Sequence, residues 1–169
     1  MFFEYETPRL LLKVLRADCA PQVLDFYNRD KELFEMYEID RVPDFYTVKH
    51  LQKVLRYEYN MAVKSQLFRF YVFKKENPCR IIGTVCIHNI APAFYGSCEI
   101  GYKFSSEFHH MGYATEAVGF CTKLAFNELR MHKVTAVVHP GNEPSIYAYF
   151  WCLWHRSAGR KGECSGKNH

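Results

Sequence analysis

The chain has 169 residues, of which 49% are hydrophobic and 24% charged, and its net charge is +4 with a pI near 8.6. This length suits one domain and this composition can bury a core, which excludes a disordered tract. The 22 Lys and Arg residues are scattered without a block of like charges, so we expect no nucleic-acid partner.

The number and spacing of the cysteines indicate the redox compartment of the protein and whether it holds a metal. Their number, seven, is odd, and no Cys-x-x-Cys pair occurs, which indicates neither a disulfide framework nor a zinc site. We expect a reducing compartment and no metal. Because the sequence has no signal peptide and no long apolar run, we expect a soluble, cytoplasmic protein without a membrane partner.

The first third of the chain predicts one strand and two helices. The strand is expected in TPRLLLKVL. A helix over 19–38 follows, with Asp18 as a possible N-cap and Pro21 in its first turn. A second helix over 47–66 begins at Thr47, which can cap it. Its mostly apolar face comprises Leu51, Val54, Leu55, Glu58, Tyr59 and Ala62.

The hydrophobic period then changes from 3.6 to 2 residues. This predicts an antiparallel meander of strands at 67–75, 80–90 and 97–104. A helical stripe over 112–129 and a strand at 132–139 follow. Because a helix crosses between them, the strands at 97–104 and 132–139 can run parallel.

A last helix is expected at 143–154, after which the composition becomes rich in Gly, Ser and basic residues. We therefore expect a single domain over 1–154 and a flexible tail over 155–169. The element order β-α-α-β-β-β-α-β-α predicts an α+β fold, in which a mixed, mostly antiparallel sheet is flanked by helices.

The segment SSEFHHMGYATEAVGF leads from a strand through a turn into a helix that a glycine opens. The first N–H groups of a helix have no internal partner and lie at the positive end of its dipole. Gly112 lets this backbone approach an anion closely. Taken alone, the pattern fits either a phosphate-binding turn or a plain helix cap.

The longer stretch EIGYKFSSEFHHMGYATEAVGFCTKLAFNELRMHKVTAVVHPGNEPSIYAY resembles the core of the GNAT superfamily of acetyl-CoA-dependent N-acetyltransferases. It is most similar to the branch of the RimJ/RimL-like ribosomal-protein acetyltransferases. The resemblance covers about residues 7–149, since TPRLLLKVL resembles that branch's first strand and RIIGTVCIHNI its third. It implies acetyl-CoA as co-substrate, and a small-molecule amine or a protein N-terminus as acceptor.

The family signature Gln/Arg-x-x-Gly-x-Gly/Ala begins here at His109 and keeps Gly112 and Ala114. His109 departs from Gln/Arg, and His110 stands where the family often has glycine. Since main-chain amides supply most of such a site, binding is still expected. The two imidazoles either add charge near phosphate or face solvent. The cofactor contacts that the resemblance implies are His109, His110, Met111, Gly112, Tyr113, Ala114 and Thr115.

The preceding strand has two implied roles. Its backbone would contact the pantetheine arm, which requires that it splay from the next strand. Glu99 would act as the base that deprotonates the amine, or is a strand carboxylate that faces solvent or forms an ion pair. Neither Cys98 nor Cys121 is expected to be a nucleophile, since they lie in apolar segments. The backbone contacts are expected at Ile100, Gly101, Tyr102, Lys103 and Phe104, of which the first two can also polarise the thioester carbonyl.

Further along, the family spacing Asn-x-x-Ala/Ser-x-x-x-Tyr falls on Asn142, Ser145 and Tyr149. The resemblance implies cofactor contacts for the first two and, for Tyr149, the acid that protonates the leaving thiolate. The alternative for Tyr149 is a core position on the last helix, because it shares an apolar stripe with Ile146 and Leu153.

The C-terminus departs from the family, because no Gly-Phe step and no further strand follow the tyrosine. Missing C-terminal strands would leave an unpaired sheet edge, which a second copy can cover in a homodimer. Three functions therefore stay open: an N-acetyltransferase that works by direct attack in a ternary complex, a non-catalytic acyl-CoA-binding protein or sensor, and a dimerising structural remnant. The carboxylates that can attract a cationic acceptor, or are merely solvated, are Glu38, Asp40, Asp44 and Glu58.

Overall fold

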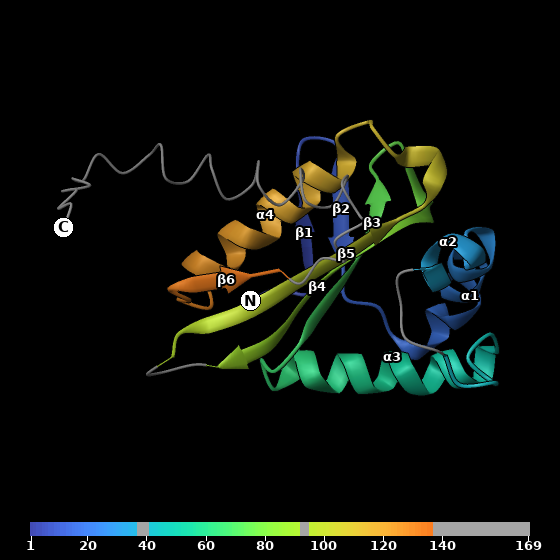
Figure 1. The fold of residues 1–169 in the computed structure, drawn as a ribbon, viewed down its shortest axis with the longest axis horizontal. Helices are drawn as coiled ribbons and strands as arrows, with labels where there is room; N and C mark the ends of the chain where they lie inside the picture. The colour runs from blue at the N-terminus through green and yellow to red at the C-terminus, as the bar shows by residue number, and fades with distance from the viewer. Residues whose placement is uncertain (37–40, 92–94, 137–169) are drawn as a thin grey trace, which may run out of the picture.

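The structure, a computed structural model, describes residues 1–36, 41–91 and 95–136. Its six-stranded sheet follows the chain order from β1 to β6 (Figure 1). The strands are β1 (Glu4–Glu6), β2 (Leu10–Lys13), β3 (Phe68–Lys74), β4 (Asn77–Ala91), β5 (Ser97–Phe104) and β6 (Lys133–Thr135). Neighbours from β1 to β5 are antiparallel, whereas β5 and β6 are parallel. The predicted mixed sheet, the meander and the parallel pair are confirmed.

The helices cover both faces of this sheet. They are η1 (Ala17–Cys19), α1 (Ala20–Arg29), α2 (Lys31–Met36), α3 (Val48–Val63), η2 (Ser106–Phe108) and α4 (Tyr113–Asn127). Because side chains alternate between the two faces of a strand, β3 contributes side chains to two hydrophobic cores, one on each face of the sheet. Phe68, Phe70 and Val72 pack in the core that includes α4. Tyr71 and Phe73 pack in the second core, with α1, α2 and α3.

Two predicted helix boundaries are corrected. The helix expected over 19–38 is two helices, because the backbone at Asp30 leaves the helical region with φ −126° and ψ 36°. Asp18 does not cap α1, since it lies inside η1 and Cys19 occupies the N-cap position. Pro21 is in the first turn as expected, and it brings no N–H that a cap would have to satisfy.

Other boundaries agree with the sequence pattern. The Thr47 hydroxyl accepts a hydrogen bond from the N–H of His50 at 3.2 Å and caps α3 as expected. The short edge strand β1 was not anticipated. Of the described helices, none combines the length and the apolarity that a bilayer span requires. The expected helix at 143–154, the tail at 155–169 and the missing C-terminal strands all lie outside the described residues.

Candidate functional site

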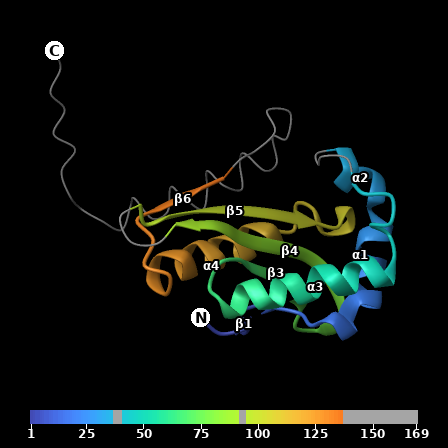
Figure 2. The ribbon, with the colours of Figure 1, turned by 90° about the horizontal axis from the view of Figure 1, so that it is seen from below.

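The candidate anion site lies where β5 passes through η2 into α4. Asp30, at the end of α1, holds this connection: its Oδ1 accepts hydrogen bonds from the N–H of Ser106 at 3.2 Å and from its hydroxyl at 2.5 Å. Figure 2 accordingly shows α1 and α2 beside the end of β5. The start of η2 is therefore anchored to the end of α1.

Gly112 gives the turn its shape. Its φ of +77° places it in the left-handed region, which glycine enters without strain, and it forms the N-cap of α4. The first rung of the helical ladder joins the N–H of Glu116 to the carbonyl of Gly112 at 3.0 Å. The amides of Tyr113 and Ala114 precede that rung and lie at the positive end of the helix. This arrangement can receive an anion.

The two histidines differ in what they do. The ring Nε2–H of His109 donates to the carbonyl of Phe104 at 3.0 Å, since a carbonyl can only accept. His109 thus ties the turn back to the end of β5. His110 is exposed and has a φ of +61°, a left-handed conformation at the position where the family signature often has glycine. Met111 beside it is also exposed, at 53%.

Basic side chains surround the turn. Arg9 lies over the Tyr113 ring at 4.5 Å, and Lys74 lies 5.7 Å from the centre of the same ring. Arg80 lies over Phe108 at 5.5 Å. Each of the three also pairs with a carboxylate: Glu116, Glu76 and Glu107, respectively. Positive groups are therefore fixed around the start of α4, although each is balanced locally.

Glu99 and His88 face each other across the sheet. They are register partners on β5 and β4, with Glu99 Oε2 3.9 Å from His88 Nδ1, and each side chain is about one third exposed. Gly101 lies on the same face of β5, and a Cβ placed on it would be 3.8 Å from His88 Nε2. His88 was missed by the sequence reasoning. The alternation in VCIHNI and the antiparallel pairing of the two strands are the signals that point to it.

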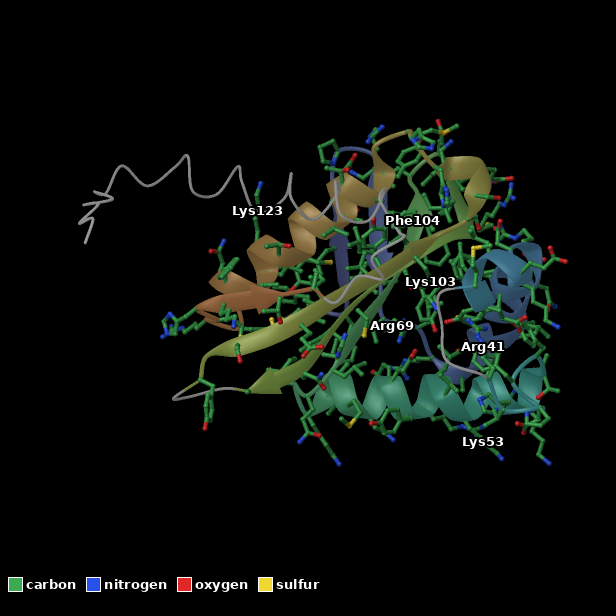
Figure 3. The ribbon with its side chains drawn as sticks, viewed as in Figure 1. Arg41, Lys53, Arg69, Lys103, Phe104 and Lys123 are labelled. Atoms are coloured by element: carbon green, nitrogen blue, oxygen red, sulfur yellow. The ribbon has the colours of Figure 1, made fainter. Side chains whose placement is uncertain are left out.

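The same face of β5 continues to Lys103, which lies toward α1 and α2 in Figure 3, whereas Phe104 points away from them. Lys103 Nζ lies 5.3 Å from the centre of the Tyr27 ring, and burial lowers its pKa to about 8. Phe104 is buried against Gly83, where a Cβ would come within 2.5 Å of the Phe104 ring. Ile100 and Tyr102 share the Phe104 face and pack in the α4 core.

A largely buried ion pair joins α3 to β3. Arg69 Nε on β3 donates to Glu58 Oε1 on α3 at 2.5 Å, and the Tyr71 hydroxyl donates to Glu58 Oε2 at 3.1 Å. Glu58 is therefore not a carboxylate open to a cationic acceptor. Asp44 pairs with His50 at 3.2 Å, and Glu38 and Asp40 lie outside the described residues.

Cys98 and Cys121 are buried core residues. Burial raises the pKa of Cys98 to about 11 and raises that of Cys121 as well, so neither is a thiolate at neutral pH. Within residues 1–36, 41–91 and 95–136, no group of three His, Cys, Asp or Glu side chains is placed to hold a metal ion.

The C-terminal half of the predicted site, Asn142, Ser145 and Tyr149, lies outside the described residues. Pairing between β5 and β6 joins Ser97–Glu99 to Lys133–Thr135, and the splay expected beyond it would also involve residues outside the described part. Of the predicted site, the structure describes β5, which carries Glu99, and the turn that leads from the end of β5 into α4.

Comparison with known proteins decides the family, because the acetyltransferase (GNAT) domain matches residues 9–151. The chain belongs to the GNAT acetyltransferase family. A probable N-acetyltransferase of Bacillus subtilis (strain 168), YjcK, is 28% identical over 137 residues, which cover 81% of this chain and 75% of that protein. An uncharacterized N-acetyltransferase of Bacillus licheniformis, p20, is 30% identical over 140 residues, covering 83% and 75%.

Solved GNAT structures share the fold. The ribosomal-protein-S5-alanine acetyltransferase from Vibrio fischeri has a TM-score of 0.82 at 22% identity and covers 88% of this chain and 81% of that one. RimJ of Mycobacterium smegmatis, in complex with CoA-disulfide, has a TM-score of 0.77 at 21% identity, covering 83% and 68%. At these identities the likeness shows the fold, and it agrees with the family that the sequence motifs predicted.

Proposed function

We propose that this GNAT protein transfers acetyl from acetyl-CoA to a primary amine by direct attack in a ternary complex. The observation that carries the proposal is the left-handed Gly112 turn, which presents the start of α4 at the end of β5. A diphosphate would accept hydrogen bonds from amides of that first turn. From Phe104 back to Glu99, the five steps between successive residues of the strand span about 17 Å, along which the pantetheine arm would extend.

Glu99 is the proposed base. An amine that is protonated at neutral pH must lose a proton before its nitrogen can attack the thioester carbon. Glu99 takes that proton, directly or through water, on the face of β5 that it shares with Gly101 and Lys103. The C–N bond forms as the C–S bond breaks, and the thiolate then takes up a proton. For that last step Tyr149 stays the predicted donor, with Asn142 and Ser145 as predicted cofactor contacts.

The acceptor would approach from the face covered by α1, α2 and α3, because α4 packs on the opposite one. Similarity to a ribosomal-protein acetyltransferase makes a protein N-terminus one candidate acceptor. Small-molecule amines are the other class. A homodimer through the β6 edge stays a prediction.

The direct test is release of coenzyme A thiol from acetyl-CoA in the presence of four acceptor classes: peptide N-termini, polyamines, aminoglycosides and amino acids. We expect amine-dependent release with at least one class, and none without amine. Acetyl-CoA binding without turnover on any class would instead support the acyl-CoA-binding alternative. Absence of binding would contradict both.

A further inference from the structure

The turn between β1 and β2 lies against the start of α4, although more than 100 residues separate them in sequence (Figure 1). Arg9 makes most of this contact. Its Nη1 donates to the carbonyl of Met111 at 3.0 Å, and its Nε donates to Glu116 Oε2 at 2.6 Å. The guanidinium therefore bridges the residue before Gly112 and the first turn of the helix.

The backbone of Arg9 is fixed as firmly as its side chain. Its N–H donates to Glu116 Oε1 at 3.0 Å, and its carbonyl accepts from the N–H of Lys75 on the β3–β4 turn. The Thr7 hydroxyl donates to the same Glu116 oxygen at 2.6 Å. Both carboxylate oxygens are thus occupied by groups of the β1–β2 turn.

Glu116 poses an electrostatic problem for an anion site. It lies in the first turn of α4, where an unbalanced carboxylate would repel a diphosphate at the helix N-terminus. Burial favours its neutral form, but the hydrogen bonds from Thr7 and Arg9 outweigh burial and lower its pKa, so it is charged at neutral pH. The Arg9 guanidinium is the cation that balances this charge.

One nitrogen of Arg9 remains for a ligand. Nη2 lies 3.4 Å from the position that a Cβ on Gly112 would occupy, at the surface of the turn. Within the described part of the chain, Nη2 makes no hydrogen bond, and the side chain is 47% exposed. A guanidinium held through Nε and Nη1 keeps its third nitrogen in a fixed direction.

We propose that Arg9 both binds the cofactor and positions its site: it holds the Gly112 turn in shape, neutralises Glu116, and directs Nη2 to the diphosphate of coenzyme A. This inference rests on the proposed function, because it takes the diphosphate to lie at Gly112. It adds a contribution from the N-terminal hairpin to the diphosphate turn, for which the family signature covers only residues 109–114.

The test measures the Kd of coenzyme A by calorimetry for the wild type, Arg9→Ala, Arg9→Lys and the double variant Arg9→Ala/Glu116→Gln. Arg9→Ala should raise Kd by about tenfold or more, as expected when one charge-assisted contact is lost. Arg9→Lys should raise it less, because it keeps the charge but not the fork. The double variant should recover part of the loss, since it removes the unbalanced carboxylate charge while Gln still accepts from Thr7.

Arg16→Ala is the matched control. Arg16 also lies over a tyrosine ring, that of Tyr59 at 4.7 Å, and also donates a hydrogen bond, but it is remote from α4. Its Kd should equal that of the wild type. Partial recovery of coenzyme A affinity in the double variant distinguishes the proposal from a purely structural role of Arg9. If Arg9 were only structural, removing a second contact at Glu116 would weaken binding further.

Three outcomes would overturn the inference: an Arg9→Ala Kd within about twofold of the wild type, a double variant no better than Arg9→Ala, or, if Arg9→Ala does not fold, an Arg9→Lys Kd equal to the wild type. Wild-type protein that binds no coenzyme A would be a different result, because it would contradict the proposed function itself.

Discussion

Gly112 is the residue whose backbone conformation matters most to the account. A side chain at a φ of +77° costs roughly 1–2 kcal/mol, and a Cβ there would touch Arg9 Nη2 at a van der Waals distance of 3.4 Å. Gly112→Ala should therefore lower the free energy of unfolding by about that amount and weaken coenzyme A binding. Chemical denaturation and calorimetry measure the two effects.

Gly101→Ala is the stability control for this prediction. At Gly101 the backbone is not left-handed, and the nearest atom to an added Cβ is His88 Nε2 at an ordinary 3.8 Å. Its free energy of unfolding should stay within about 0.5 kcal/mol of the wild type. Equal losses in both alanine variants would contradict the account of the Gly112 turn.

Glu99 carries the second prediction at this scale. Glu99→Gln removes the proposed base while keeping the shape of the side chain, so kcat should fall by about 100-fold or more. The KM for acetyl-CoA should change little, because the carboxylate is assigned to the amine. Glu4→Gln, on β1 at the opposite edge of the sheet, should have wild-type kinetics. A Glu99→Gln enzyme with normal kcat would exclude the proposed role.

Between elements, the Glu58–Arg69 pair joins α3 to β3. Glu58 is 8% exposed and Arg69 23%, so removing the carboxylate leaves a mostly buried charge without its partner. Glu58→Ala should lower the free energy of unfolding by about 3–5 kcal/mol. Denaturant unfolding measures it, with Glu4→Ala as the matched control: Glu4 pairs with Lys13 on the surface, and its loss should cost about 0–1 kcal/mol. Similar decreases in the free energy of unfolding for the two variants would show that the Glu58–Arg69 pair stabilises the fold no more than the surface pair does.

The strands and helices that local periodicity defines were predictable. The alternation in LFRFYVFKK and SCEIGYKF fixes β3 and β5 almost to the residue, and the stripe after Gly112 fixes α4. The break between α1 and α2 was not predictable, because Asp30 is drawn out of the helix beside Ser106, 76 residues away. Nor does helical spacing show that Glu58, on a mostly apolar face, is neutralised by a residue of the next strand.

Across the whole molecule, the candidate site depends on contacts that no local pattern contains. The sequence signature predicted an anion site at the turn before α4 and a base, Glu99, on β5, and both stay predictions. It did not identify Arg9 as part of the site, since Arg9 was assigned only to a strand. Nor did it identify Glu116 as a charge that a neighbouring cation has to neutralise. An acidic residue in the first turn of a helix proposed to bind an anion is the available signal, because its charge requires a neighbouring cation.

The contact between the N-terminal hairpin and α4 should make the free energy of unfolding depend on pH in the acidic range. Because the pKa of Glu116 is lowered in the folded state, its stabilisation is complete above the ordinary value of 4.5 and is lost as the pH falls through the lower folded value. The free energy of unfolding should therefore fall more steeply below about pH 4.5 for the wild type than for Glu116→Gln. Denaturant titrations between neutral pH and about pH 3 test this, and parallel curves would contradict it.

The most direct test of the central claim is a crystal structure of the protein with coenzyme A. The account predicts diphosphate oxygens within hydrogen-bonding distance of the main-chain amides at the start of α4, Arg9 Nη2 beside them, and the pantetheine arm extended along β5 toward Glu99. Coenzyme A bound at another surface, or a Gly112 turn left empty at a saturating cofactor concentration, would contradict it.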